Sequence, residues 1–224
     1  MDKKQYYQLS PDSIYSDVKI SDTKRVAKVC GVDILVFPNV FPSDKFRSTA
    51  LCLNSIKDLV NGKTICDMGC GPGTVGIFSL RNGAKSVVHV DINPFAVQNA
   101  IENKALYNFS DNQSKVYKSD CFDNVPKQLF DLIIFPMPYH NDEIDIEDPL
   151  QRAFYDPGFK SIKKFLSQIP DYSHDKTEIY ISFSNKGDVN QLEDIFNNFG
   201  YKWDLWKISN EDSEFDNRFY KINL

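Results

Sequence analysis

The chain has 224 residues, of which 42 % are hydrophobic and 25 % charged, which suits one domain with a buried core and excludes a disordered or low-complexity protein. The formal net charge is −5, so the chain as a whole lacks the basic surplus that is typical of nucleic-acid-binding proteins. The first residues are polar, and no apolar run reaches the roughly 18 residues that span a bilayer. We therefore expect a cytoplasmic protein without a membrane partner.

The cysteine and histidine content argues against a metal centre. Five cysteines are scattered without a C-x-x-C pair, and three histidines are present, none spaced with a cysteine as in a zinc finger. The pattern predicts reduced, mostly buried thiols and no metal site.

The predicted elements begin with a β-hairpin. Residues 25–36 contain β-branched runs on either side of Gly31. After a break at two prolines, Ser43 is expected to cap a helix over about 44–60. Short apolar runs then alternate with helical patterns: strands are predicted over 64–68, 87–90, 115–118 and 130–135, and helices over 74–82 and 93–107.

The pattern becomes irregular over 136–157, which holds several prolines and an acidic stretch. Further predicted elements are helices over 159–168 and 189–199, a strand over 178–184, and two apolar runs over 201–209 and 218–224. Strands alternating with helices predict an α/β fold with a mostly parallel sheet, and the last two runs predict an antiparallel hairpin at one edge. We divide the chain into an N-terminal extension or lid, 1–43, and an α/β domain, 44–224.

The glycine-rich segment after the strand at 64–68 is the most informative motif. Asp67, Gly69, Gly71 and Gly73 occupy alternate positions where a strand ends and a helix begins. Glycines let the backbone turn sharply and approach a ligand, and a nucleotide-like molecule binds at this place in open α/β sheets. A G-x-G-x-x-G dinucleotide pattern also fits at 71–76, but it starts after the strand has ended.

The register that starts at Asp67 resembles motif I of the class I S-adenosylmethionine (SAM) methyltransferases. Asp91, at the end of the next strand, could accept both ribose hydroxyls of an adenosine ligand. The resemblance further implies that Asp120 contacts the adenine amino group and that Thr49 covers the methionine end of SAM. It also places Ile92 and Cys121 beside the cofactor.

The resemblance extends over about residues 37–224 and implies the Rossmann-like, seven-stranded sheet of that class. Residues 48–53 and 83–85 are similar to the ribosomal-protein methyltransferases. Residues 130–139 are more similar to the N/D-P-P-Y group, which includes the release-factor glutamine methyltransferases and many nucleobase N-methyltransferases.

The fourth-strand motif departs from the family pattern at Pro136. In the family, an Asn or Asp side chain at this position accepts the N–H groups of a planar amine or amide, and proline offers no such acceptor. Pro138 and Tyr139 match the pattern, and Tyr139 is expected to form an aromatic wall of the acceptor site. His140 follows directly and is either a general base or an exposed loop histidine. The acids after it either hold a cationic amine or are solvated.

We therefore expect an enzyme that transfers a methyl group from SAM, its cofactor, to a nitrogen of a protein side chain or small amine. An RNA base or another small molecule is the alternative acceptor. Two other classes remain open: a dinucleotide-dependent oxidoreductase, and an inactive protein that keeps the SAM-binding fold as a binding module.

Overall fold

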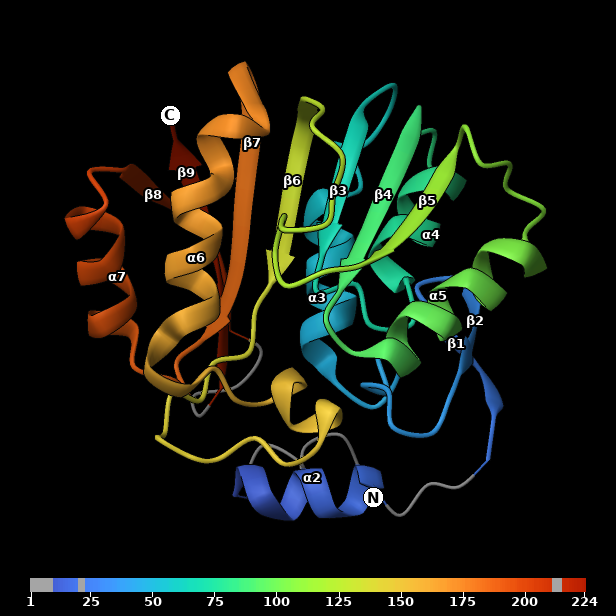
Figure 1. Cartoon of the computed structure of the whole chain (residues 1–224), viewed down its shortest axis with the longest axis horizontal. Helices are drawn as coiled ribbons and strands as arrows, with labels where there is room; N and C mark the ends of the chain where they lie inside the picture. Colours follow the sequence, from blue (N-terminus) through green and yellow to red (C-terminus); the bar gives the residue numbers. More distant parts are fainter. Residues whose placement is uncertain (1–9, 20–22, 211–214) are drawn as a thin grey trace.

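A seven-stranded sheet forms the centre of the molecule, with the strand order β5-β4-β3-β6-β7-β9-β8 (Figure 1). The computed structural model describes residues 10–19, 23–210 and 215–224. The strands of this sheet are β3 (Thr64–Met68), β4 (Ser86–Asp91), β5 (Ser114–Lys118), β6 (Phe130–Pro136), β7 (Ser173–Ser184), β8 (Lys202–Asn210) and β9 (Asp216–Asn223). Strands β3 to β7 run parallel, whereas β9 lies antiparallel between β7 and β8. The predicted parallel sheet with an antiparallel hairpin at one edge is confirmed.

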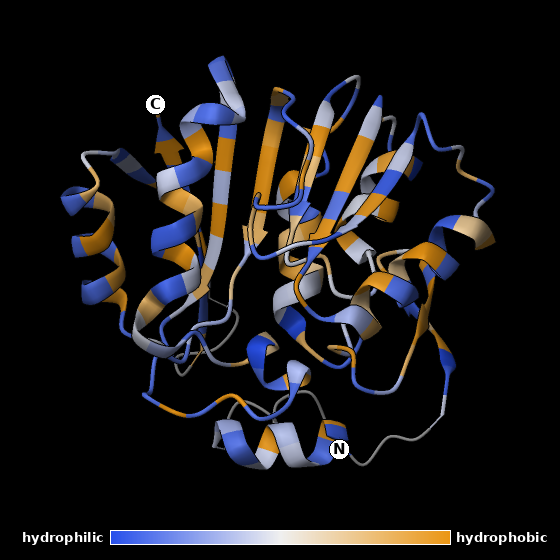
Figure 2. Ribbon diagram, viewed as in Figure 1, coloured by the Kyte–Doolittle hydropathy of each residue, from blue (hydrophilic) through white to orange (hydrophobic). Residues whose placement is uncertain are grey.

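Helices cover both faces of this sheet. The helices of one face are α6 (Lys160–Gln168) and α7 (Val189–Asn198), and those of the other face are α3 (Arg47–Ile56), α4 (Thr74–Arg81) and α5 (Pro94–Leu106). The central strands are buried on both sides and are therefore mostly hydrophobic, as Figure 2 shows for β6, although β3 and β4 carry the buried polar residues Asp67 and His89.

The predicted hairpin forms β1 (Arg25–Val29) and β2 (Val32–Val36), which pair antiparallel as a separate two-stranded sheet. Buried asparagines of α5 hold its edge: Leu35 N donates to Asn103 Oδ1 at 2.8 Å, and Phe37 N donates to Asn99 Oδ1 at 2.8 Å. Side-chain amides thus take the place of a neighbouring strand for one backbone N–H group in β2 and one just after it.

The prediction that Ser43 caps a helix over 44–60 is wrong. A turn closes from Lys45 N to Pro42 O, so Ser43 lies inside that turn and its Oγ bonds Thr74 Oγ1 at 2.8 Å. The helix, α3, begins after Phe46 and ends at Ile56. Instead of capping a helix, the Ser43 side chain therefore links the segment before α3 to the first residue of α4.

A helix that the sequence analysis did not predict, α2 (Pro11–Lys19), lies beside the carboxyl ends of the parallel strands (Figure 1). Ser10 Oγ accepts from Ser13 N at 3.3 Å, and Pro11 occupies the first turn. A serine followed by proline and an acid is a usual helix start, so the signal was present in the sequence.

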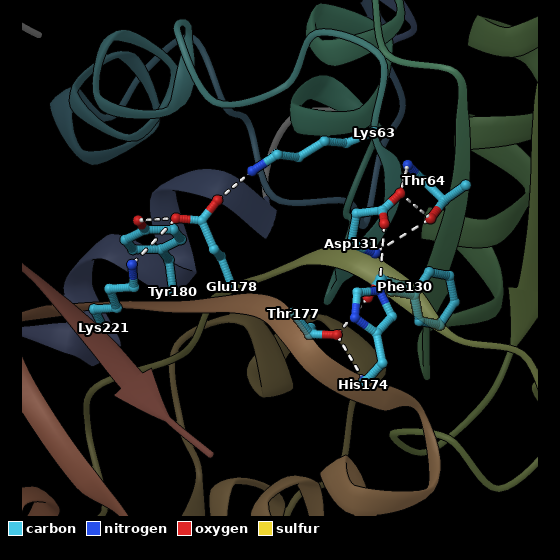
Figure 3. A network of polar contacts seen from close by, with 9 residues as sticks. All are labelled: Lys63, Thr64, Phe130, Asp131, His174, Thr177, Glu178, Tyr180 and Lys221. Atoms are coloured by element: carbon cyan, nitrogen blue, oxygen red, sulfur yellow. Dashed lines mark hydrogen bonds and ion pairs between the residues drawn. The ribbon is translucent and has the colours of Figure 1, made fainter.

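The opposite, amino-terminal ends of the strands are joined by a polar network (Figure 3). Asp131 at the start of β6 accepts from Thr64 N at 2.8 Å and from Thr64 Oγ1 at 2.7 Å, and these bonds hold the pKa of Asp131 below its usual range. Its other oxygen lies 3.3 Å from His174 Nε2 of β7. The carboxylate therefore fixes the register of β6 between β3 and β7, at the end of the sheet away from the site described next.

No helix within the described ranges is long and apolar enough to cross a membrane.

Candidate active site

A cavity opens at the carboxyl ends of the parallel strands and collects most of the predicted site residues. Its lining includes Thr49, Asp67, Gly69, Gly71, Asp91, Ile92, Asp120, Cys121, Pro138 and Tyr139. Gly73 and His140 lie outside the lining. Residues from four strands meet there because parallel strands all end at the same edge of the sheet.

The glycine loop leaves β3 and enters α4 with three residues in the left-handed region. Gly69, Gly71 and Gly73 have φ values of +66°, +55° and +84°. Gly73 is the N-cap of α4. It does not line the cavity, and it allows the left-handed backbone at the helix start, which a side chain would strain. The loop is held toward the sheet by the hydrogen bond from Cys70 N to Val90 O at 2.9 Å.

The structure gives a packing reason for the last glycine of the apparent dinucleotide pattern. A Cβ at Gly76 would lie 2.1 Å from His89 Cε1 and 2.7 Å from Val87 Cγ1. His89 is fully buried on β4, with Nε2 3.1 Å from Ser114 Oγ. Gly76 thus makes room for β4 beneath α4, and its presence carries no information about a pyrophosphate.

Asp67 is fully buried at the end of β3 and has one oxygen without a partner. Its Oδ2 accepts from Gly76 N at 2.9 Å and lies 3.3 Å from His89 Nδ1, whereas Oδ1 has no hydrogen-bond partner among the described residues. Leaving a buried carboxylate oxygen unpaired is costly. Because Asp67 lines the cavity, an entering ammonium group would remove that cost.

Asp91 lies at the end of β4 on the wall of the same cavity. Its Oδ2 accepts from Gly71 N and its Oδ1 from Asn93 N, both at 2.8 Å. Burial raises the pKa of Asp91 to about 6, although the two backbone N–H groups oppose that shift. The carboxylate keeps further lone pairs for a ligand, while it ties the glycine loop to the start of α5.

Asp120 and Cys121 follow β5, and both line the cavity. Asp120 pairs with Lys164 of α6, whose Nζ lies 2.7 Å from Oδ2. Cys121 has a left-handed backbone (φ +51°), and burial raises the pKa of its thiol to about 12. The thiol is therefore neutral at pH 7, and Asp120 keeps one oxygen free of the ion pair.

The segment after β6 forms the other end of the cavity. Pro136, Met137, Pro138 and Tyr139 all line it, and the Tyr139 ring packs edge-on against Phe183 with centroids 6.2 Å apart. His140 instead turns into the loop, where its backbone pairs with residues 154–156. Burial lowers the pKa of His140, so its imidazole is neutral at pH 7.

The short helix η1 (Pro149–Ala153) lines this end of the cavity, and α2 packs against η1. Ile14 and Val18 of α2 pack against Leu150 and Phe154 in a separate apolar cluster. The Tyr155 hydroxyl donates to Asp12 Oδ1 at 2.5 Å, and Lys19 pairs with Asp148. Residues of the N-terminal extension proposed from the sequence, 1–43, therefore support the loop that lines the acceptor end of the cavity.

Two residues that the sequence analysis missed also line the cavity: Ser182 of β7 and Asn217 of β9. Both are at least nine-tenths buried, with 5 % and 1 % of their surface exposed. Asn217 Nδ2 lies 3.1 Å from Ser182 Oγ. A polar residue within a hydrophobic strand is the sequence signal, but the distance in sequence to the fourth-strand motif hides their proximity.

These features define a class of protein. One cavity collects the segments that follow four successive core strands: a glycine loop, an acid, a further acid and a proline-rich aromatic segment. This is the arrangement of the class I SAM-dependent methyltransferases. Comparison with known sequences agrees, since residues 31–158 match the Methyltransferase small domain family. The chain belongs to this family and is a SAM-dependent methyltransferase.

Relatives and solved structures extend this comparison. The chain is 31 % identical over 151 residues to a Methanocaldococcus jannaschii protein provisionally named a protein N5-glutamine methyltransferase, covering 66 % of this chain and 73 % of that one. It is 34 % identical over 137 residues to the ribosomal protein L11 methyltransferase of Aquifex aeolicus, covering 59 % of this chain and half of the relative. Its fold resembles that of a 16S rRNA N2 G1207 methyltransferase from T. thermophilus solved with AdoMet and guanosine, with a TM-score of 0.65, 16 % identity, and coverage of 90 % of this chain and 50 % of that one.

Proposed function

We propose that this chain transfers the methyl group of SAM to the side-chain amide nitrogen of glutamine in a protein substrate. The observation that carries the proposal is the lack of a carboxylate at the acceptor end of the cavity. There the described lining is apolar or neutral apart from Arg152, and the acidic candidates Asp142 and Glu143 are exposed and outside it. A cationic amine would find no counter-charge at this end, whereas a neutral amide needs none.

The residues present fit SAM at the other end of the cavity. Asp67 would accept from the ammonium group through its unpaired Oδ1, and Asp91 would accept from the ribose hydroxyls. Asp120 and Cys121 would border the adenine, with Ile92 beside the ribose and Thr49 over the methionine end. When bound, SAM supplies a methyl group made electrophilic by its sulfonium.

The protein has little covalent chemistry to perform. The acceptor nitrogen forms the new N–C bond as the S–C bond breaks, S-adenosylhomocysteine (SAH) is left, and the nitrogen gives one proton to water. Tyr139 and Pro138 would hold the amide plane in line with the methyl group, because transfer depends mainly on alignment. His140, which lies outside the cavity lining, is not needed as a base for this acceptor.

The name of the M. jannaschii relative supports a glutamine acceptor. The net charge of −5 supports a protein over an RNA substrate.

The test follows labelled methyl groups from SAM into an extract separated into protein, RNA and small molecules. We expect label in protein, released as volatile methylamine on acid hydrolysis, because hydrolysis of an N-methyl amide frees that amine. Label in RNA, or label that stays on lysine after hydrolysis, would refute the proposal. A Tyr139→Ala variant provides the matched negative control.

A further inference from the structure

The absence of an acceptor side chain at Pro136 leaves the proposed reaction without its usual means of orienting an amide. Proline has neither a side-chain acceptor nor a backbone N–H. The Pro136 carbonyl is one backbone alternative, but one oxygen cannot fix both the position and the rotation of a planar amide.

Two buried polar side chains lie next to this position on the neighbouring strands. Pro136 is the register partner of Ser182 across β6 and β7. Asn217 of β9 faces Ser184 across β7 and β9, two residues further along the same face as Ser182. Pro136, Ser182 and Asn217 therefore form a diagonal row across three strands, and all three line the cavity.

The hydrogen bond between them leaves Asn217 with unused capacity. The amide has two N–H donors and a carbonyl with two lone pairs, and Ser182 Oγ, 3.1 Å from Nδ2 and 3.3 Å from Oδ1, occupies one of these groups. Because Ser182 Oγ lies close to both atoms, it occupies the edge between them, and the N–H that remains on Nδ2 points away from Oδ1. The Asn217 side chain is 1 % exposed and is held by Ser182, so its orientation is fixed in advance.

We propose that Asn217, held by Ser182, recognises a primary carboxamide in place of the acceptor that Pro136 lacks. The Nδ2 N–H that Ser182 leaves free donates to the carbonyl of the substrate amide. A donor at this place fits the carbonyl of a carboxamide and does not fit an ammonium group, which has no acceptor. The inference rests on the proposed methyl transfer to glutamine, and it identifies Asn217 as the residue that recognises the glutamine amide.

The experiment compares Asn217→Ala and Asn217→Asp with the wild type, using labelled SAM and the protein fraction of the extract as acceptor. Asn223→Ala is the matched control, since Asn223 is on the same strand and bonds Asp204 Oδ2 instead. We expect both Asn217 variants to lose about 10- to 100-fold in methylamine-releasing transfer. SAH affinity measured by calorimetry should stay within about twofold, and Asn223→Ala should behave like the wild type.

A second substitution tests for a positioning role rather than a structural one. Adding Pro136→Asn to Asn217→Ala restores a side-chain amide beside the same row, and we expect it to recover part of the lost transfer. Because Asn217→Asp keeps the shape of the side chain, it decides the question if Asn217→Ala does not fold.

The outcomes separate the two proposals. If the wild type binds SAH but labels no protein, the proposed function fails. If the wild type labels protein and the Asn217 variants transfer methyl at the wild-type rate, or lose SAH binding in proportion to activity, this inference is overturned.

Discussion

Binding of SAH should weaken as the pH falls from 7 to 5, because the carboxylate of Asp91 must be ionised to accept from both ribose hydroxyls. Burial raises the pKa of Asp91 to about 6 from the usual 3.8. The ionised fraction then falls from about nine-tenths at pH 7 to about one-tenth at pH 5. The dissociation constant should therefore rise about tenfold, equivalent to about 1.4 kcal/mol. Isothermal calorimetry at several pH values measures it directly.

The control is Asp91→Asn, which keeps the shape of the side chain and removes the titration. This variant should bind more weakly at pH 7 and show no further loss down to pH 5. Other titratable groups of the chain could add to the slope, so the variant is needed to assign it to Asp91. A wild-type affinity that stays constant to pH 5, as an unshifted carboxylate would give, refutes the reasoning, and so does an equal slope in Asp91→Asn.

Other predictions concern Tyr139 in the cavity, the polar network around Asp131, and helix α2. Tyr139→Ala should keep SAH affinity within about twofold and lower turnover about 100-fold; unchanged methyl transfer would place the acceptor elsewhere. Asp131→Asn should lower the free energy of unfolding in urea by about 1 kcal/mol, since it weakens the bonds from Thr64 at a half-exposed site, with SAH affinity unchanged. Because the pKa of Asp131 is lowered on folding, this difference should be present at pH 7 and shrink as the pH falls below about 4. Tyr155→Phe should speed amide hydrogen exchange in α2 about fivefold by removing the bond to Asp12, and an unchanged rate would show that apolar packing alone holds this helix.

Local patterns in the sequence were sufficient to predict the strands of the central sheet and the helices between them. A short, mostly apolar run followed by a glycine predicts β3, and Asn93-Pro94 predicts the start of α5, where Asn93 accepts from Phe95 N at 2.9 Å. The alternation of short apolar runs with helices predicts a parallel sheet, because such strands need helical crossovers. The motifs that follow successive strands meet for a related reason. Parallel strands end at the same edge of the sheet, so motifs that are far apart along the chain lie side by side there.

Contacts between distant segments could not be predicted in this way. Ser43 had the chemistry of a helix cap, yet it bonds Thr74, since the turn at Pro42 directs it toward α4. His140 follows the motif directly, but the loop turns it away from the cavity.

The sequence by itself determined the class of protein, since the glycine loop and its acids act through backbone conformation and local order. Only the tertiary structure decided what surrounds the acceptor. It brings Ser182 and Asn217, from strands about 45 and 80 residues beyond Pro136, into one row with it. The pairing of strands is set by hydrogen bonds and burial summed over the whole sheet, and no short segment carries that information.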